Sequence, residues 1–257
     1  MKPQFIDVHA HINFSDYDAD REDVIRRARD AGVWMINVGV EQKESKLAVE
    51  LAEKYSEGVY AIVGHHPTST EEFDVDFYRK LAKNKKVVGI GECGLDFFRA
   101  PEENAREKQK VIFRAQIELA LELDLPLMIH CRDAYADTLA ILNEYKAKAG
   151  DKLRGDFHFF AGDTETAQKI LDLGFNISFT GVITFAREYE KLVKFIPLER
   201  MFSETDCPFV TPVPNRGKRN EPLFVRDVVS KIARIRGEEE EKVKKQLLEN
   251  AVKFFRL

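Results

Sequence analysis

Eight short apolar runs rich in Val, Ile and Phe recur along the chain, and helix-like stretches separate them. The runs span residues 5–11, 34–40, 59–66, 87–95, 126–131, 155–162, 175–181 and 201–208. Strands that alternate with helices predict an α/β fold with a parallel sheet. Because eight β/α units in 257 residues match the usual size of a closed barrel, the sequence predicts a single-domain (β/α)8 TIM barrel over residues 1–257.

The intervening stretches carry apolar residues at helical spacing. We expect helices over residues 21–32, 44–55, 104–124 and 137–150, and two closing helices over 221–237 and 238–257. An open doubly wound sheet is the alternative, but such sheets usually carry a glycine-rich phosphate turn after the first strand. That turn would fall in HAHINFSD, which contains no glycine.

The charge balance limits how the chain can contact nucleic acid. Its net charge is -4, whereas a protein that coats nucleic acid broadly is usually basic, so any contact should be local. No apolar stretch is long enough to predict a membrane span, and the first residues lack the apolar core of a signal peptide. Three widely spaced cysteines form no disulfide pattern, so we expect a reducing, cytoplasmic location.

All six histidines fall near the carboxyl ends of predicted strands, where barrels of this kind carry their active sites. They are His9, His11, His65, His66, His130 and His158. Since residues i and i+2 share a strand face, His9 and His11 should aim two imidazoles into the mouth, about 7 Å apart at the backbone. Converging neutral nitrogens suit a metal ion. Asp7 should share that face, either bonding a ligand from behind or capping a buried polar layer.

Three carboxylates end predicted strands in apolar surroundings: Glu92, Glu204 and Asp206. A buried acid is costly unless it is paired or binds a cation, so each needs a partner. A plain salt bridge is the alternative to a metal, most of all for Glu204. Cysteines 93, 131 and 207 each follow a candidate ligand, so strand alternation should turn them toward the helices as small buried residues.

Six motifs in order, from residue 5 to residue 222, resemble those of the TatD-like metal-dependent hydrolases, a branch of the amidohydrolase-type barrels. They are DVHAH, GHHP, GECGLDF, PLMIHCRDAYADTLAIL, HFFAGD and ETDCPFVTPVPNRGKRNEP. The chain departs from the family pattern at Phe159 and Phe160, where Cys and a Phe before Ser or Thr are more frequent. It also departs at Asn215, where His is common. Neither departure touches a proposed ligand.

The resemblance implies two divalent metals and phosphodiester hydrolysis of DNA, including removal of nucleotides from the 3′ end. It places His9, His11, Glu92 and Asp206 around one metal. It places Glu92, His130 and His158 around the other, with Glu92 bridging. The mixture of imidazole and carboxylate suits Zn, Mg or Mn.

Two divalent cations and two carboxylates leave the mouth about two units positive, which favours an anionic substrate. Asp206 and Glu92 are the predicted catalytic residues, with Asp206 orienting the water and accepting its proton. The predicted substrate-binding residues are His66, Arg132, Arg216 and Lys218. Arg99 and Arg219 are further phosphate donors, and Phe97, Phe98 and Phe160 are candidates for stacking on a base.

Three functional hypotheses follow. The first is a metal-dependent deoxyribonuclease that acts on DNA or nucleotide ends, without a membrane partner. The second is a metal-dependent amidohydrolase or esterase for a small molecule. The third is a non-catalytic barrel, stapled by metals, that binds a partner protein. The sequence marks no oligomer interface, and a monomer stays open.

Overall fold

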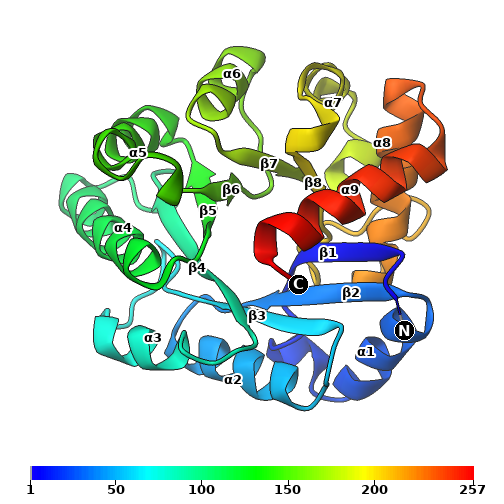
Figure 1. Ribbon diagram of the computed structural model, residues 1–257, viewed down its shortest axis with the longest axis horizontal. Coiled ribbons are helices and arrows are strands. Elements are labelled where there is room, and N and C mark those ends of the chain that lie inside the picture. The colour runs from blue at the N-terminus through cyan, green and yellow to red at the C-terminus, as the bar shows by residue number, and fades with distance from the viewer. Residues whose placement is uncertain (1) are drawn as a thin grey trace.

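The computed structural model describes residues 2–257. Eight strands form one parallel sheet in the order β1 to β8, and helices surround it, as Figure 1 shows. The predicted (β/α)8 barrel is confirmed. The strands are β1 (Phe5–Ala10), β2 (Val33–Val38), β3 (Val59–Val63), β4 (Val87–Asp96), β5 (Leu127–Arg132), β6 (Gly155–Phe157), β7 (Asn176–Phe179) and β8 (Met201–Ser203).

The helices agree with those expected from the sequence, and three short ones are added. The expected ones are α1 (Arg21–Asp30), α2 (Gln42–Glu53), α4 (Glu103–Leu123), α5 (Tyr135–Ala149), α8 (Val225–Arg236) and α9 (Glu240–Phe255). The added ones are α3 (Val75–Leu81), α6 (Thr164–Asp172) and α7 (Glu190–Phe195). With nine residues or fewer each, these three are too short to show a clear helical period.

β6 and β8 end earlier than the apolar runs suggest, at Phe157 and Ser203. The backbone soon leaves the extended conformation, because φ is +45° at Phe159 and +54° at Asp206. His158 and Asp206 therefore lie just beyond their strands, in the loops at the barrel mouth.

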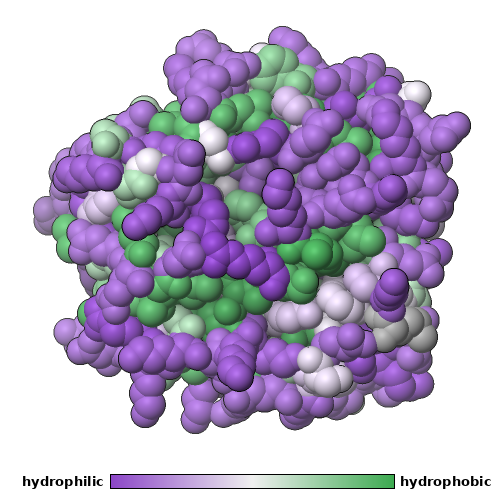
Figure 2. All heavy atoms as spheres, viewed as in Figure 1, coloured by the Kyte–Doolittle hydropathy of each residue, from purple (hydrophilic) through white to green (hydrophobic). Residues whose placement is uncertain are grey.

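The core has two parts. One cluster lies between the sheet and the helices. The other joins residues of six strands with the last helix, which is possible only inside the barrel: Ile6, Val8, Ile36, Val38, Ile62, Val88, Met128, Phe202, Ala251 and Phe255. α9 crosses this end of the barrel, opposite the mouth (Figure 1). Apolar side chains gather in the centre of that face, framed by hydrophilic ones (Figure 2). No helix within residues 2–257 is long and apolar enough to cross a membrane.

An irregularity in β1 corrects the expected position of Asp7. Between Asp7 and Ala10, two residues of β1, Val8 and His9, stand opposite one residue of β2, Ile36. Val8 packs inside the barrel and Ala10 packs against the helices, so strict alternation fails across this bulge. Asp7 consequently turns to the seam with the last strand, where its carboxylate accepts bonds from Thr205 N at 2.9 Å and Thr205 Oγ1 at 2.6 Å. Of the two roles left open for Asp7, it belongs to a buried polar layer.

The same seam closes the barrel. A single bridge pairs Ala10 with Cys207 in parallel. Asp206 N donates to His9 O and His11 N donates to Cys207 O, both at 2.9 Å. The segments that close the sheet therefore also carry His9, His11 and Asp206.

Thr205→Val tests how much this seam contributes to stability. The substitution keeps the side-chain shape but removes the hydroxyl that donates to Asp7 and accepts from Cys207 N. We expect the free energy of unfolding, measured by urea denaturation, to fall by about 1–3 kcal/mol. Thr205→Ser keeps the hydroxyl and should lose less. Equal losses for the two variants would contradict the assigned role.

Candidate metal centre and active-site pocket

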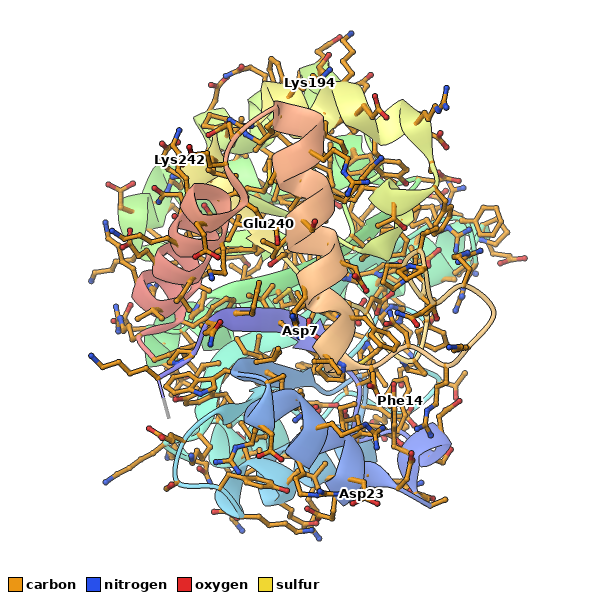
Figure 3. All side chains as sticks on the ribbon, turned by 90° about the vertical axis from the view of Figure 1, so that its right-hand side faces the viewer. Asp7, Phe14, Asp23, Lys194, Glu240 and Lys242 are labelled. Carbon is orange, nitrogen blue, oxygen red and sulfur yellow. The ribbon has the colours of Figure 1, made fainter. Side chains whose placement is uncertain are left out.

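A cavity of about 770 Å³ opens at the carboxyl ends of the strands, and each strand contributes to its wall through its last residues or the loop that follows. Taken in order around the barrel, its lining includes Phe14, Glu41, His66, Arg99, Arg132, Phe159, Tyr189 and Phe209. Phe14 lies beside the loop that follows β8, away from α9 (Figure 3), and its ring centroid is 6.3 Å from that of Phe209. The cavity lies where the histidines were expected.

Glu92 occupies the floor of the cavity, and its two oxygens face different imidazoles. Glu92 Oε1 lies 2.8 Å from His130 Nδ1 and 2.9 Å from His158 Nε2. Glu92 Oε2 lies 3.4 Å from His9 Nε2 and 3.8 Å from His11 Nε2. The carboxylate thus stands between two pairs of imidazoles, as a ligand shared by two cations would.

Asp206 faces the two imidazoles carried by β1 and the residue that follows it, His9 and His11. Its Oδ1 is 3.4 Å from His11 Nε2 and 3.8 Å from His9 Nε2, and these two nitrogens are 3.0 Å apart. Three groups of donor atoms that could each hold one ion, with members within 4.8 Å of one another, are His9–His11–Asp206, His9–His158–Glu204 and His66–Glu92–His130. The structure therefore brings together all six predicted ligands, and His66 joins them.

The charges of this cluster fit a cation. Burial opposes ionisation of Glu92, but the facing His158 and His66 and the bond from His130 hold its pKa well below the usual range. The pKa of Asp206 is also lowered, because the bond from His11 and the nearby imidazoles outweigh burial. Across residues 2–257, the salt-bridge partners of Glu92 and Asp206 are histidines alone. Two buried carboxylates among imidazoles form a donor set that divalent metals prefer.

Groups behind the cluster orient its imidazoles. His11 Nδ1 is 2.9 Å from Val38 O, which leaves its Nε2 facing the centre. His130 Nε2 is 3.1 Å from Asp96 Oδ2, so His130 turns Nδ1 toward Glu92. Asp96 was not identified from the sequence, although it lies four residues after Glu92 on the same strand and shares its face.

Glu204 stands behind His158, and both of its carboxylate oxygens accept hydrogen bonds. Its Oε1 is 3.4 Å from His158 Nδ1 and accepts a bond from Phe159 N at 2.7 Å. Its Oε2 accepts from Ser178 Oγ at 2.7 Å. Glu204 is fully buried, so it meets no substrate and acts on the site through His158 and the loop that carries it.

The residues predicted to bind substrate lie at different depths. His66 and Arg132 line the cavity, and His66 Nε2 is 3.4 Å from Glu92 Oε1. The Arg132 guanidinium lies 3.9 Å from the ring centroid of Phe98, which is 58% exposed. Arg216 and Lys218 are exposed on the loop after β8 and do not line the cavity.

Three expectations about neighbouring side chains are wrong. Arg219 turns away from the mouth, because its guanidinium pairs with Asp20 at 2.6 Å and covers the Tyr17 ring. Phe97 and Phe160 are buried in the core and cannot stack on a base. The left-handed backbone at Phe159 brings that side chain to the cavity wall in place of Phe160.

His65 and the cysteines lie outside the cluster. His65 is buried on the helix side of β3, where Gln116 of α4 bonds its backbone, and burial lowers its pKa to about 4. Cys93 and Cys207 are buried as expected. Cys131 faces Thr138 of α5 but also borders the cavity, and burial raises the pKa of its thiol to about 12. A protonated thiol is a poor nucleophile, which leaves catalysis to the imidazoles and carboxylates.

Comparisons with known proteins agree with this geometry. The family described as TatD related DNase matches residues 6–256. The Bacillus subtilis protein named uncharacterized metal-dependent hydrolase YabD is 41% identical, over 98% of each chain. The Pantoea ananatis protein named 3'-5' ssDNA/RNA exonuclease TatD is 36% identical, over 98% of this chain and 99% of its own. The crystal structure of YJJV, a TatD homolog from Escherichia coli K12, has a TM-score of 0.90 at 27% identity and covers both chains fully.

Glu204→Gln tests the support behind His158. Because the substitution removes the negative charge that faces His158 Nδ1, we expect affinity for Zn²⁺ or Mn²⁺ to fall about 10- to 100-fold, measured by competition with a chelating dye. Glu165→Gln, on the exposed face of α6, should leave affinity unchanged. A folded Glu204→Gln variant with unaltered metal affinity would limit Glu204 to holding the Phe159 backbone.

Proposed function

The chain belongs to the TatD-related DNase family of metal-dependent hydrolases, enzymes that hydrolyse ester bonds, and we propose that it is a phosphodiesterase removing nucleotides from the 3′ end of DNA. One observation carries the proposal: a carboxylate set between two pairs of imidazoles lies on the floor of a cavity whose wall holds arginines. Such a centre suits a substrate that is both anionic and small at its reacting end.

We assign the metal ligands in two groups. His9, His11, Glu92 and Asp206 would hold one divalent ion, and Glu92, His130 and His158 would hold a second, with Glu92 bridging. Zn, Mg and Mn all accept this mixture of nitrogen and oxygen donors. When bound, such ions neutralise phosphoryl charge and make water more acidic.

Asp206 is the best placed proton acceptor. Its carboxylate borders the cavity and is 8% exposed, so water can reach it. Its lowered pKa keeps it ionised at neutral pH, as a general base requires. The left-handed backbone at Asp206 and the bond from its N–H to His9 O fix its direction.

Arg132 and His66 would hold the phosphate. A guanidinium can grip two phosphate oxygens through parallel bonds, and stacking on Phe98 keeps the plane of Arg132 fixed. His66 Nδ1 is 2.7 Å from Thr68 Oγ1, which orients its ring toward the cavity floor. A phosphodiester held between them would lie next to Glu92, because His66 Nε2 is 3.4 Å from Glu92 Oε1.

The shape of the cavity favours an end over the middle of a strand. Glu92 and the histidines close its floor, and apolar residues fill the barrel beneath. A strand can therefore enter but not pass through. The name of the Pantoea ananatis relative, a 3'-5' exonuclease of single-stranded DNA and RNA, supports the 3′ end.

The two other hypotheses are weaker. The organophosphorus hydrolase of Deinococcus radiodurans has a TM-score of 0.66 at 13% identity, which shows only a shared fold. A small-molecule substrate would not need the arginines of the rim. A metal that only staples a fold is enclosed by protein ligands, whereas this cluster borders an open cavity.

Asp206→Asn is the direct test of catalysis. Asparagine tolerates the left-handed backbone but cannot accept the proton, so cleavage of a 3′-labelled DNA strand should fall about 10²- to 10⁴-fold at every metal concentration. Metal-stripped protein restored with one ion at a time supplies the baseline. Asp124→Asn, also at a positive φ but at the far end of the barrel, should keep full activity. Substantial cleavage by a folded Asp206→Asn variant would refute the role of Asp206.

Arg132→Lys tests the phosphate grip and the substrate class together. Lysine keeps the charge but loses the two parallel bonds, so KM for the labelled strand should rise roughly tenfold. Arg154→Lys, at the amino end of β6, serves as the control. Amides and lactones should not be hydrolysed by either protein. Turnover of these compounds, without cleavage of DNA, would favour the small-molecule hypothesis.

A further inference from the structure

The mouth of the cavity is charged differently on its two sides. On the β2–β3 side, Glu41 lines the wall with the hydroxyls of Thr68 and Ser69. Glu44 and Glu71 lie close to Glu41, and burial together with these two acids raises its pKa. A polyanion that leaves the cavity in this direction would pass three carboxyl groups.

The β7–β8 side carries a cation on an exposed aromatic ring. Phe185 follows β7 and is 42% exposed, and the Arg216 guanidinium lies 3.9 Å from its ring centroid. Arg216 Nη1 donates to Thr211 O at 3.3 Å. Within residues 2–257 no carboxylate pairs with Arg216, whereas Arg219, three residues later, pairs with Asp20. The Arg216 charge is therefore available to a ligand.

This pair lies just outside the cavity. Val210 and Tyr189 line the wall, and the loops that carry them extend directly to Arg216 and Phe185. The two loops are joined by a bond from Val213 N to Thr184 Oγ1 at 2.9 Å. A group bound at the pair would sit next to one bound in the cavity.

We propose that Phe185 and Arg216 form a second nucleotide subsite, over which a single strand leaves the cavity on the β7–β8 side. The inference rests on the proposed nuclease function and adds the path of the strand. Stacking on Phe185 and the bond from Nη1 to Thr211 O leave the other N–H groups of the guanidinium to grip the next backbone phosphate. The exposed part of the ring and the guanidinium plane offer surfaces for an unpaired base. The acidic β2–β3 side repels the same backbone.

The subsite would bind a single-stranded oligonucleotide that carries at least one phosphate beyond the scissile one. A duplex hides the base faces on which the subsite acts. The subsite therefore contributes to long single strands and contributes nothing to a substrate that ends inside the cavity.

The experiment compares two substrates with two variants, Phe185→Ala and Arg216→Gln. We expect KM for a 3′-labelled single strand of ten nucleotides to rise about 5- to 30-fold in each, since one stacked base contributes about 1–3 kcal/mol. Hydrolysis of bis(p-nitrophenyl) phosphate, which fits within the cavity, should stay unchanged. Arg219→Gln, on the same loop but facing Asp20, is the matched control and should alter neither reaction.

Fluorescence anisotropy of the labelled strand measures binding without catalysis. It therefore distinguishes a failure of the proposed nuclease function from a failure of the proposed subsite. Wild-type protein that binds the strand but cleaves neither substrate would refute the proposed function alone, and weaker binding by Arg216→Gln would still support the subsite. Equal binding and equal KM for wild type and both variants would overturn the subsite. An equal loss on both substrates would also overturn it, because the pair would then only support the cavity wall.

Discussion

The contact between one buried carboxylate and several imidazoles organises the mouth of this barrel. Glu92 meets side chains from β1, the loop after β3, β5 and the loop after β6, so four separate parts of the chain share one acid. Its position depends on local backbone geometry. Between Ile90 and Cys93, two residues of β4 stand opposite one of β5, and this bulge directs Glu92 to the centre. Gly91 makes this possible, because a Cβ there would lie 2.6 Å from Met128 O.

The polar groups around Glu92 form layers: the inner one faces the cavity, and the outer ones orient it. The innermost donors face the cavity, and Asp96 and Glu204 hold two of them from behind. Asp156, deeper in β6, is fully buried, and burial with the nearby Glu204 raises its pKa well above the usual range. Burial therefore disfavours a negative charge on Asp156 beneath the site. The centre keeps its negative charge where cations can reach it.

Much of this could be predicted from the sequence, because it depends on period and order. Strand alternation placed His9 and His11 together, and the position of each histidine at a strand end placed the cluster at the mouth. The errors arose where the backbone departs from regular geometry. The bulge in β1 places Asp7 at the seam with the last strand. The positive φ at Phe159 directs the Phe159 side chain, and not that of Phe160, to the cavity wall. Arg219 was misplaced because its partner, Asp20, is distant in sequence.

The seam between the first and last strands determines when, during translation, the barrel can close. His9 leaves the ribosome about two hundred residues before Asp206, yet these two segments must pair before the sheet becomes a ring. A nascent chain shorter than this has neither the closed ring nor the complete donor set. An incomplete polypeptide would thus lack the hydrolytic centre until its last strand has been made.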